Sequence, residues 1–282
     1  MKLVRYGRAG SEKPGLVDAE GKIRDLSRVI DDITGATLSS TELNKLKKLK
    51  PEKLPLVKGN PRLGPPVGQI GKYLAIGLNY ADHAKEAGMP IPKEPIIFTK
   101  AISCIVGPND NVMQPRDSKK LDWEAELGFV IGRVARYVDE KRALDYVAGY
   151  CVCNDVSERE FQLERGGTWD KGKGADTFGP IGPWLVTKDE IKDPQKLGIW
   201  LEVNGRRVQN GNTSTMIFGV AHLVSYMSRF ITLMPGDVVC TGTPPGVGQG
   251  MKPPMFLKPG DVMRVGLDGL GVQTQKVIAA KG

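Results

Sequence analysis

Two glutamates at alternate positions of an apolar, strand-forming run are the first candidates for chemistry in this chain. Glu124 and Glu126 are separated by one residue, and residues two apart on a strand point to the same face. Two carboxylates beside a buried run repel each other and lose hydration, and a cation relieves both costs. An edge strand that carries two solvated glutamates is the alternative that this segment leaves open.

Asp155 ends a second apolar run, at residues 148–155. Three carboxylates that converge from two strand ends would form an all-oxygen site, which favours a hard cation such as Mg²⁺ or Mn²⁺. Such a site leaves about three octahedral positions for water and substrate. An aspartate at this position can instead cap the helix that we expect over residues 158–164.

His83 and Glu86 are three residues apart in a short segment that we expect to be helical, so their side chains meet on one face. A carboxylate beside an imidazole orients the ring and raises its basicity, which suits a general base for water. Asn79 is positioned to cap this helix. A surface histidine is the alternative. The other histidine, His222, lies in an apolar helical pattern that indicates a structural role.

Two glycine-rich segments are further candidates for a site. Residues 169–176 place Lys171 and Lys173 in a stretch that we expect to be flexible and that lacks the spacing of a phosphate-binding P-loop. Residues 241–248 follow an expected strand, and their backbone N–H groups and hydroxyls could hold an anionic group. An ordinary loop is the alternative for each segment.

The elements that must position these residues are mostly β with some α. The 282 residues include 35 glycines and 20 prolines without a collagen-like period. They make up about 20% of the chain against an average near 12%, which indicates many turns between short strands. We therefore expect an α+β fold built around a β-roll or sandwich.

The chain is expected to divide into a small N-terminal domain, residues 1–68, and a catalytic domain, residues 69–282. The first part is expected to contain short strands near residues 2–6, 15–18 and 22–25, a helix at 40–49, and a proline-rich connector. It carries 14 Lys/Arg against 8 Asp/Glu, which accounts for most of the net charge of +8.

Several functional classes are excluded by composition. The densest basic run, residues 45–50, has the pattern of an amphipathic helix whose lysines face water, and no aromatic interleaving supports nucleic-acid binding. No apolar run approaches the roughly 18 residues of a membrane-spanning helix. The first residues lack a signal-peptide stretch, so we expect a cytoplasmic protein. The four cysteines form no C-x-x-C pair and are expected to be reduced and buried.

Taken together, the motifs resemble those of the fumarylacetoacetate hydrolase family. G-x-N-Y-x-D-H, E-x-E, N-D-V-S-x-R, G-K-G-x-D-T-F-G-P-x-G-P-W and T-G-T-P-x-G-V-G occur in the family's order. The resemblance implies a mixed β-roll catalytic domain with a small N-terminal domain. It also implies a homodimer and one Mg²⁺ per subunit, with Mn²⁺ or Ca²⁺ as alternatives.

The resemblance also implies roles for nine residues. The expected metal ligands are Glu124, Glu126 and Asp155; the expected catalytic residues are His83, Glu86 and Lys173; and the expected substrate contacts are Arg159, Gln162 and Thr243.

The activity that the resemblance implies is cleavage of a C–C bond in a 2,4-diketo acid of the 2,4-diketo-3-deoxy-L-fuconate or L-rhamnonate type. The products would be pyruvate and a hydroxy acid such as lactate, and the partner a small anionic keto acid. Ureidoglycolate lyase, oxaloacetate decarboxylase, acylpyruvase and isomerase activities use the same core and stay open. An inert binding module is the alternative outside enzymology.

Overall fold

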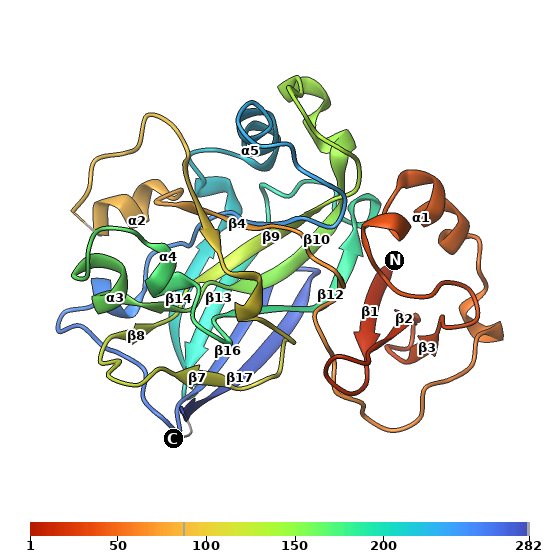
Figure 1. Ribbon diagram of the computed structural model, residues 1–282, viewed down its shortest axis with the longest axis horizontal. Helices are drawn as coiled ribbons and strands as arrows, with labels where there is room; N and C mark the ends of the chain where they lie inside the picture. Colours follow the sequence, from red (N-terminus) through yellow and green to blue (C-terminus); the bar gives the residue numbers. More distant parts are fainter. Residues whose placement is uncertain (87, 281–282) are drawn as a thin grey trace.

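A ten-stranded sheet forms the centre of the computed structural model, which describes residues 1–86 and 88–280 (Figure 1). Its strands lie in the order β3 (Ile23–Asp25), β2 (Lys13–Val17), β1 (Lys2–Tyr6), β12 (Gly179–Thr187), β10 (Val147–Asn154), β9 (Ala125–Ile131), β15 (Val238–Cys240), β4 (Tyr73–Gly77) and β5 (Ile96–Lys100), and β6 (Ile105–Val106) pairs with β12. Every residue of β9 and β10 is buried, as in strands that are covered on both faces.

A second sheet of five strands packs on the centre of the first. Its order is β14 (Arg206–Asn212), β13 (Gly198–Val203), β16 (Val262–Leu267), β17 (Gly271–Ala279) and β7 (Val112–Gln114). β13 and β16 contact β9, β16 and β17 contact β10, and β17 also contacts β12. Apolar side chains between the two layers form the core. The expected fold class, mostly β with some α, is confirmed.

The helices are short and lie around the sheets. They are α1 (Ser40–Lys47), α2 (Ala81–Glu86), α3 (Arg159–Leu163), α4 (Asp170–Lys173) and α5 (Val220–Met227). Single 3₁₀ turns cover Gly35–Thr37, Pro51–Lys53, Ile102–Cys104, Lys188–Glu190, Thr213–Thr215 and Gly248–Gly250, and a longer 3₁₀ segment covers Glu140–Tyr146. A two-stranded pair, β8 (Leu121–Asp122) and β11 (Ser157–Glu158), precedes α3. α2, α3 and α4 gather at one end of the molecule (Figure 1).

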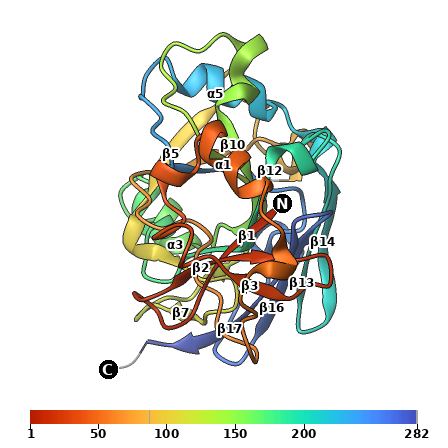
Figure 2. The same ribbon diagram turned by 90° about the vertical axis from the view of Figure 1, so that its right-hand side faces the viewer.

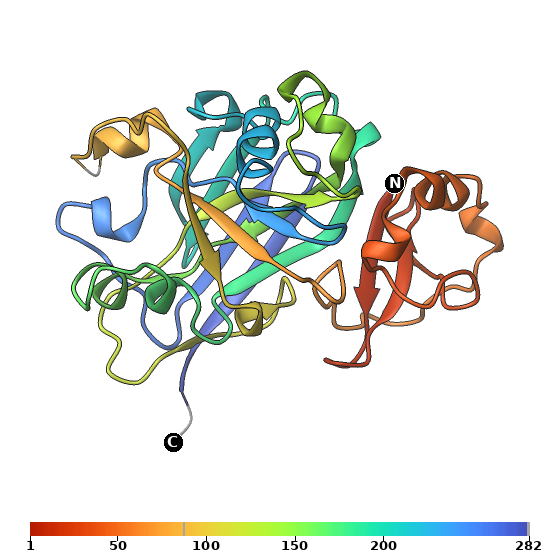
Figure 3. The same cartoon turned by 45° about the horizontal axis from the view of Figure 1, so that its top comes forward.

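The N-terminal segment lies at one side of the molecule (Figures 2 and 3). Its three strands and its helix occur close to where the sequence predicts them, with Leu43 and Leu46 of α1 buried and the lysines of that helix exposed. β1 pairs with β12, so the segment extends the large sheet. The domain division at residues 68 and 69 stays a prediction.

Two further expectations concern the state of the cysteines and the absence of membrane-spanning helices. All four cysteines are free and buried, as predicted. Within the described part of the chain, no helix has the length and apolar character needed to cross a membrane.

Candidate active site

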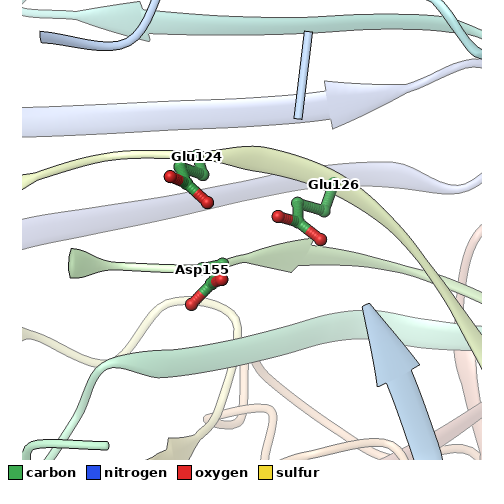
Figure 4. A group of neighbouring side chains, drawn as sticks. All are labelled: Glu124, Glu126 and Asp155. Atoms are coloured by element: carbon green, nitrogen blue, oxygen red, sulfur yellow. The ribbon is translucent and has the colours of Figure 1, made fainter. Parts of the chain in front are cut away.

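Three buried carboxylates meet where β9 begins beside the end of β10 (Figure 4). Glu126 lies on β9, Glu124 lies in the break between β8 and β9, and Asp155 directly follows β10. One oxygen of each lies within 4.8 Å of the others, and the three side chains point toward a common space. The exposed fractions of Glu124 and Glu126 are 6% and 1%, so the alternative of two solvated glutamates is wrong.

Asp155 does not cap a helix. The cap of α3 is Glu158, whose carboxylate accepts the backbone N–H of Glu160. The carboxylate of Asp155 instead accepts from Lys100 and Lys173. The capping alternative is therefore wrong, and Asp155 is free to serve the site.

Two buried cations contact the carboxylates from the cavity side. The ammonium of Lys173 is 2.8 Å from Glu124 Oε2 and 2.9 Å from Asp155 Oδ2. Arg159 Nη2 is 2.7 Å from Glu124 Oε1. Glu126 has no ion-pair partner among the described residues and accepts the backbone N–H of Gly242 at 2.7 Å.

These contacts shift the pKa values of the two glutamates in opposite directions. Burial alone would raise the pKa of Glu124, but Lys173 and Arg159 outweigh burial and hold that pKa below its ordinary value. Burial raises the pKa of Glu126 well above its ordinary value, and the neighbouring carboxylates add to the effect. The three carboxylates offer oxygen ligands, and Glu126 has no positive side chain paired with it among the described residues. A hard divalent cation at this position would provide the missing charge.

His83 and Glu86 form a close pair on α2. Glu86 Oε2 lies 3.0 Å from His83 Nδ1, and its other oxygen accepts the backbone N–H of Gly246 at 2.9 Å. His83 is only 8% exposed, so the alternative of a surface histidine is wrong. Because Glu86 engages Nδ1, the nitrogen that remains for proton transfer is Nε2.

A cavity of about 460 Å³ adjoins the carboxylates and brings most of the predicted residues together. Seven of the nine expected site residues line it: His83, Glu86, Glu124, Arg159, Gln162, Lys173 and Thr243. Glu126 and Asp155 are buried beside Glu124 rather than in the wall. Much of the remaining wall is apolar, with Met89, Phe98, Leu163, Trp169, Val247 and Met251.

The three expected substrate contacts differ in what they can offer a ligand. Arg159 Nη1 donates to Gln162 Oε1 at 3.0 Å, Nε donates to Asp122, and Nη2 lies 2.7 Å from Glu124 Oε1. The hydroxyl of Thr243 donates to the carbonyl of Ala125 and accepts from Gln209. A guanidinium has five N–H hydrogens, so Arg159 keeps two that can be donated to an anion, whereas Thr243 has already used its proton.

The two glycine-rich segments differ from their expected forms. Residues 170–173 form α4 instead of a flexible stretch, and this turn buries Lys173. The N–H groups of Gly242, Gly246 and Gly248 donate to Glu126, Glu86 and Asp122, so they hold carboxylates of the protein instead of an external anion.

Asn79 differs from its expected role, whereas His222 lies outside the cavity, in agreement with the structural role expected for it. Asn79 does not cap α2. Its side-chain amide donates to the backbone carbonyls of Phe218 and Thr241, and these hydrogen bonds connect the turn before α2 to two segments that are distant in the sequence. His222 is half-exposed on α5, stacks on Phe218 and lies 3.0 Å from Glu140. It does not line the cavity.

Two charged residues at the site were missed by the sequence analysis. Lys100 is the last residue of β5 and is fully enclosed, and Asp122 accepts from Arg159 Nε and from the backbone N–H groups of Gly248 and Gln249. A lysine that ends an apolar strand, and an aspartate two residues before Glu124, were the available signals. Neither signal identifies the partner, because each partner lies far away in the sequence.

Comparison with protein families places most of the chain in a known group. The family model described as fumarylacetoacetate (FAA) hydrolase C-terminal matches residues 72–278. A protein of Burkholderia ambifaria, named "Putative hydrolase", is 63% identical over 282 residues, which are 100% of both chains.

Two solved structures share the fold over nearly the full length. Fumarylacetoacetate hydrolase from the psychrophile Exiguobacterium antarcticum is 34% identical, with a TM-score of 0.85 and coverage of 99% of this chain and 100% of that chain. Maleylpyruvate hydrolase from Sphingobium sp. SYK-6, in complex with manganese(II) ion and pyruvate, is 27% identical, with a TM-score of 0.84 and coverage of 100% of both chains.

Proposed function

Because the chain belongs to the fumarylacetoacetate hydrolase family, we propose that it is a divalent-metal-dependent hydrolase that cleaves a C–C bond of a 2,4-diketo acid. The observation that carries the proposal is the meeting of three carboxylates with the His83–Glu86 pair and Lys173 around one cavity. The Sphingobium enzyme, which holds manganese(II) and pyruvate, supports both the ion and the product.

Glu124, Glu126 and Asp155 would hold the ion, for which Mg²⁺ is the first choice and Mn²⁺ or Ca²⁺ the alternatives. The carboxylate and 2-keto oxygen of the substrate would chelate a bound ion, which would supply Lewis-acid polarisation of the carbonyls. Arg159 would donate one of its two remaining N–H hydrogens to the same carboxylate, and Gln162 would keep the guanidinium in place.

The remaining steps fall to residues of the cavity wall. His83, oriented by Glu86, takes a proton from water at Nε2, and the hydroxide adds to the C4 carbonyl. The C3–C4 bond then breaks, and its electron pair becomes a pyruvate enolate that is protonated at C3. The ammonium of Lys173 stabilises the enolate charge as it develops. General-base assistance of this kind contributes about 10²–10⁴-fold to the rate.

The apolar part of the wall supports a hydrocarbon end on the acyl tail. Trp169 packs edge-on against Phe98, with ring centroids 5.3 Å apart, and the ring of Phe98 is 5.4 Å from the ammonium of Lys173. A tail that leaves C4 would therefore meet aromatic surface next to the reacting groups. A 2,4-diketo-3-deoxy-L-fuconate or L-rhamnonate, which ends in a methyl group and would release lactate, fits this wall.

Other reactions that the same site residues could catalyse would give different products. A ureidoglycolate lyase would release glyoxylate and urea, an oxaloacetate decarboxylase CO₂ and pyruvate, and an acylpyruvase pyruvate with a simple carboxylic acid. An isomerase would move protons without cleavage. No observation in the cavity favours one of these above the hydrolase, so they serve as outcomes of the test.

The test incubates the protein and Mg²⁺ with 2,4-diketo-3-deoxy-L-rhamnonate, acetopyruvate, ureidoglycolate and oxaloacetate, with and without EDTA. We expect EDTA-sensitive release of pyruvate and lactate from the first substrate, and a lower kcat/KM for it in Trp169→Ala. Glyoxylate and urea, or CO₂ from oxaloacetate alone, would overturn the proposal in favour of the corresponding alternative. The homodimer and the cytoplasmic location stay predictions, and light scattering tests the first.

A further inference from the structure

Lys100 is enclosed beneath the carboxylates and takes no part in the cavity wall. It is the last residue of β5, its side chain has no exposed surface, and its ammonium lies against Asp155 Oδ1. The same ammonium donates to the backbone carbonyls of Lys173 and Val156. Because an ammonium has three hydrogens, these three acceptors use all of them.

The three acceptors belong to segments that supply the site. Asp155 and Val156 follow β10, and Lys173 ends α4. Lys100 thereby joins β5, the segment after β10 and the end of α4 at one point. A buried cation with all of its donors satisfied has one favourable position, so it restricts the movement of the groups that it contacts.

Lys100 fixes both the orientation of the Asp155 carboxylate and the position of the Lys173 backbone. Lys173 contacts Asp155 Oδ2 from the cavity side, while Lys100 contacts Oδ1 from the side away from the cavity. The carboxylate is therefore held from both oxygens. Each oxygen offers a second lone pair, so these contacts leave Asp155 able to ligate an ion.

We propose that Lys100 is a positioning residue of the metal site: it holds Asp155 and the end of α4 in the arrangement that binds the ion. Removal of an outer partner that orients a ligand typically weakens metal binding by about 10–100-fold. The proposal rests on the metal site of the proposed function and does not depend on the substrate. It is distinct from a role in stability alone, which would leave metal affinity unchanged.

Lys72 provides a matched control. Its ammonium is 2.8 Å from the carboxylate of Asp237, which is also buried. Lys72 precedes β4, and the site lies at the other end of that strand, where Gly77 lines the cavity. Lys72→Met therefore removes a lysine from a buried aspartate without touching the site.

The experiment measures Mg²⁺ and Mn²⁺ binding by calorimetry, without any keto acid, in Lys100→Met, Lys100→Arg and Lys72→Met. Urea unfolding in EDTA measures the stability of each metal-free protein. We expect Lys100→Met to lose about 10–100-fold in metal affinity. Lys100→Arg, which keeps the charge in a bulkier group, should fall between it and the wild type, and Lys72→Met should bind metal as the wild type does.

Activity gives a second readout. The activity of Lys100→Met should rise with Mg²⁺ concentration as the metal site fills, whereas the activity of a variant of the cavity wall such as His83→Ala should not. A folded Lys100→Met with wild-type metal affinity overturns the proposal, even if its stability falls.

If Lys100→Met does not fold, Lys100→Gln replaces it under the same criterion. If neither neutral variant folds, wild-type affinity in Lys100→Arg overturns the proposal and a weaker affinity supports it. Absence of metal binding in the wild type would contradict the proposed metal site itself.

Discussion

The two histidines of the chain show how surroundings decide the function of one residue type. His83 is almost enclosed, is oriented by Glu86 and lines the cavity, whereas His222 is half-exposed on α5 and stacks between aromatic rings. Each has a glutamate at 3.0 Å from Nδ1. The pairing with a carboxylate is thus common to both, and only access to the cavity distinguishes them.

His83→Ala is expected to lower kcat by about 10²–10⁴-fold, the usual contribution of a general base. Its Mg²⁺ affinity, measured by calorimetry, should stay unchanged because the imidazole is not an expected ligand. His222→Ala is the control and should keep wild-type kcat. Near-normal turnover in His83→Ala would refute the role of His83 as the base.

Glu126→Gln separates metal binding from stability. Glu126 has no ion-pair partner among the described residues, and burial raises its pKa well above the ordinary value, so a neutral amide costs less to bury than the carboxylate. We expect Mg²⁺ affinity to fall at least as far as the roughly 10–100-fold caused by loss of an outer partner, while urea unfolding in EDTA shows no loss of stability. Unchanged Mg²⁺ affinity would remove Glu126 from the ligand set.

At the scale of elements, the loop after β15 is fastened to the site by carboxylates from three other segments. Glu126 on β9, Glu86 on α2 and Asp122 on β8 each accept a backbone N–H of a glycine in this loop. Gly246 has a φ of 102°, and an added Cβ would lie 2.0 Å from the carbonyl oxygen of Val208, so the loop requires glycine there. The loop and the cavity wall therefore form one hydrogen-bonded unit.

Asp122→Asn is expected to loosen this unit. The asparagine cannot accept from Arg159 and from both loop N–H groups, and breaking a buried charged pair costs about 3–5 kcal/mol. Urea unfolding should show that loss, and KM for the keto acid should rise because Arg159 loses the contact of its Nε with a carboxylate and is held less firmly.

The control for Asp122→Asn is Asp145→Asn. Asp145 pairs with Arg142 at the surface, where an ion pair contributes about 0–1 kcal/mol. Equal stability losses in the two variants would contradict the importance of the buried network.

At the scale of the whole molecule, the N-terminal segment and the catalytic segment share one sheet. β1 pairs with β12 through Lys2 opposite Val186 and Leu3 opposite Leu185. Arg62 also reaches across, because its guanidinium contacts Glu12 and Asp110 at 2.9 and 2.5 Å. The segment therefore covers an edge that the catalytic segment would otherwise expose.

Deletion of residues 1–68 is expected to leave β12 without its neighbour. An uncovered strand edge pairs readily with other chains, so the shortened protein should form large species in light scattering at concentrations where the full chain does not. A monodisperse fragment that unfolds as cooperatively as the full chain would instead support two independent domains.

The sequence alone determined the fold class and most of the residues that meet at the site, for a physical reason that is local. Alternation along an extended segment predicted that Glu124 and Glu126 share one side, and helical spacing predicted that His83 lies beside Glu86, because both periodicities are properties of the backbone. No local pattern identified Lys100 or Asp122. The motifs supplied Asp155 and Lys173. The positions of α1 and of the first three strands, to within about two residues at each end, also follow from local turns and apolar spacing.

Only the tertiary structure decided how charge is distributed among these groups. That Lys173 bridges Glu124 and Asp155, that Lys100 lies beneath Asp155, and that glycine N–H groups bind carboxylates all depend on segments far apart in the sequence. Burial and ion pairing are properties of the assembled core, and no periodicity records them. For the same reason the sequence alone left Asp155 open as a cap and residues 169–176 as a flexible stretch. The contacts of Asp155 with Lys100 and Lys173 decided the first, and the packing of α4 against α3 decided the second.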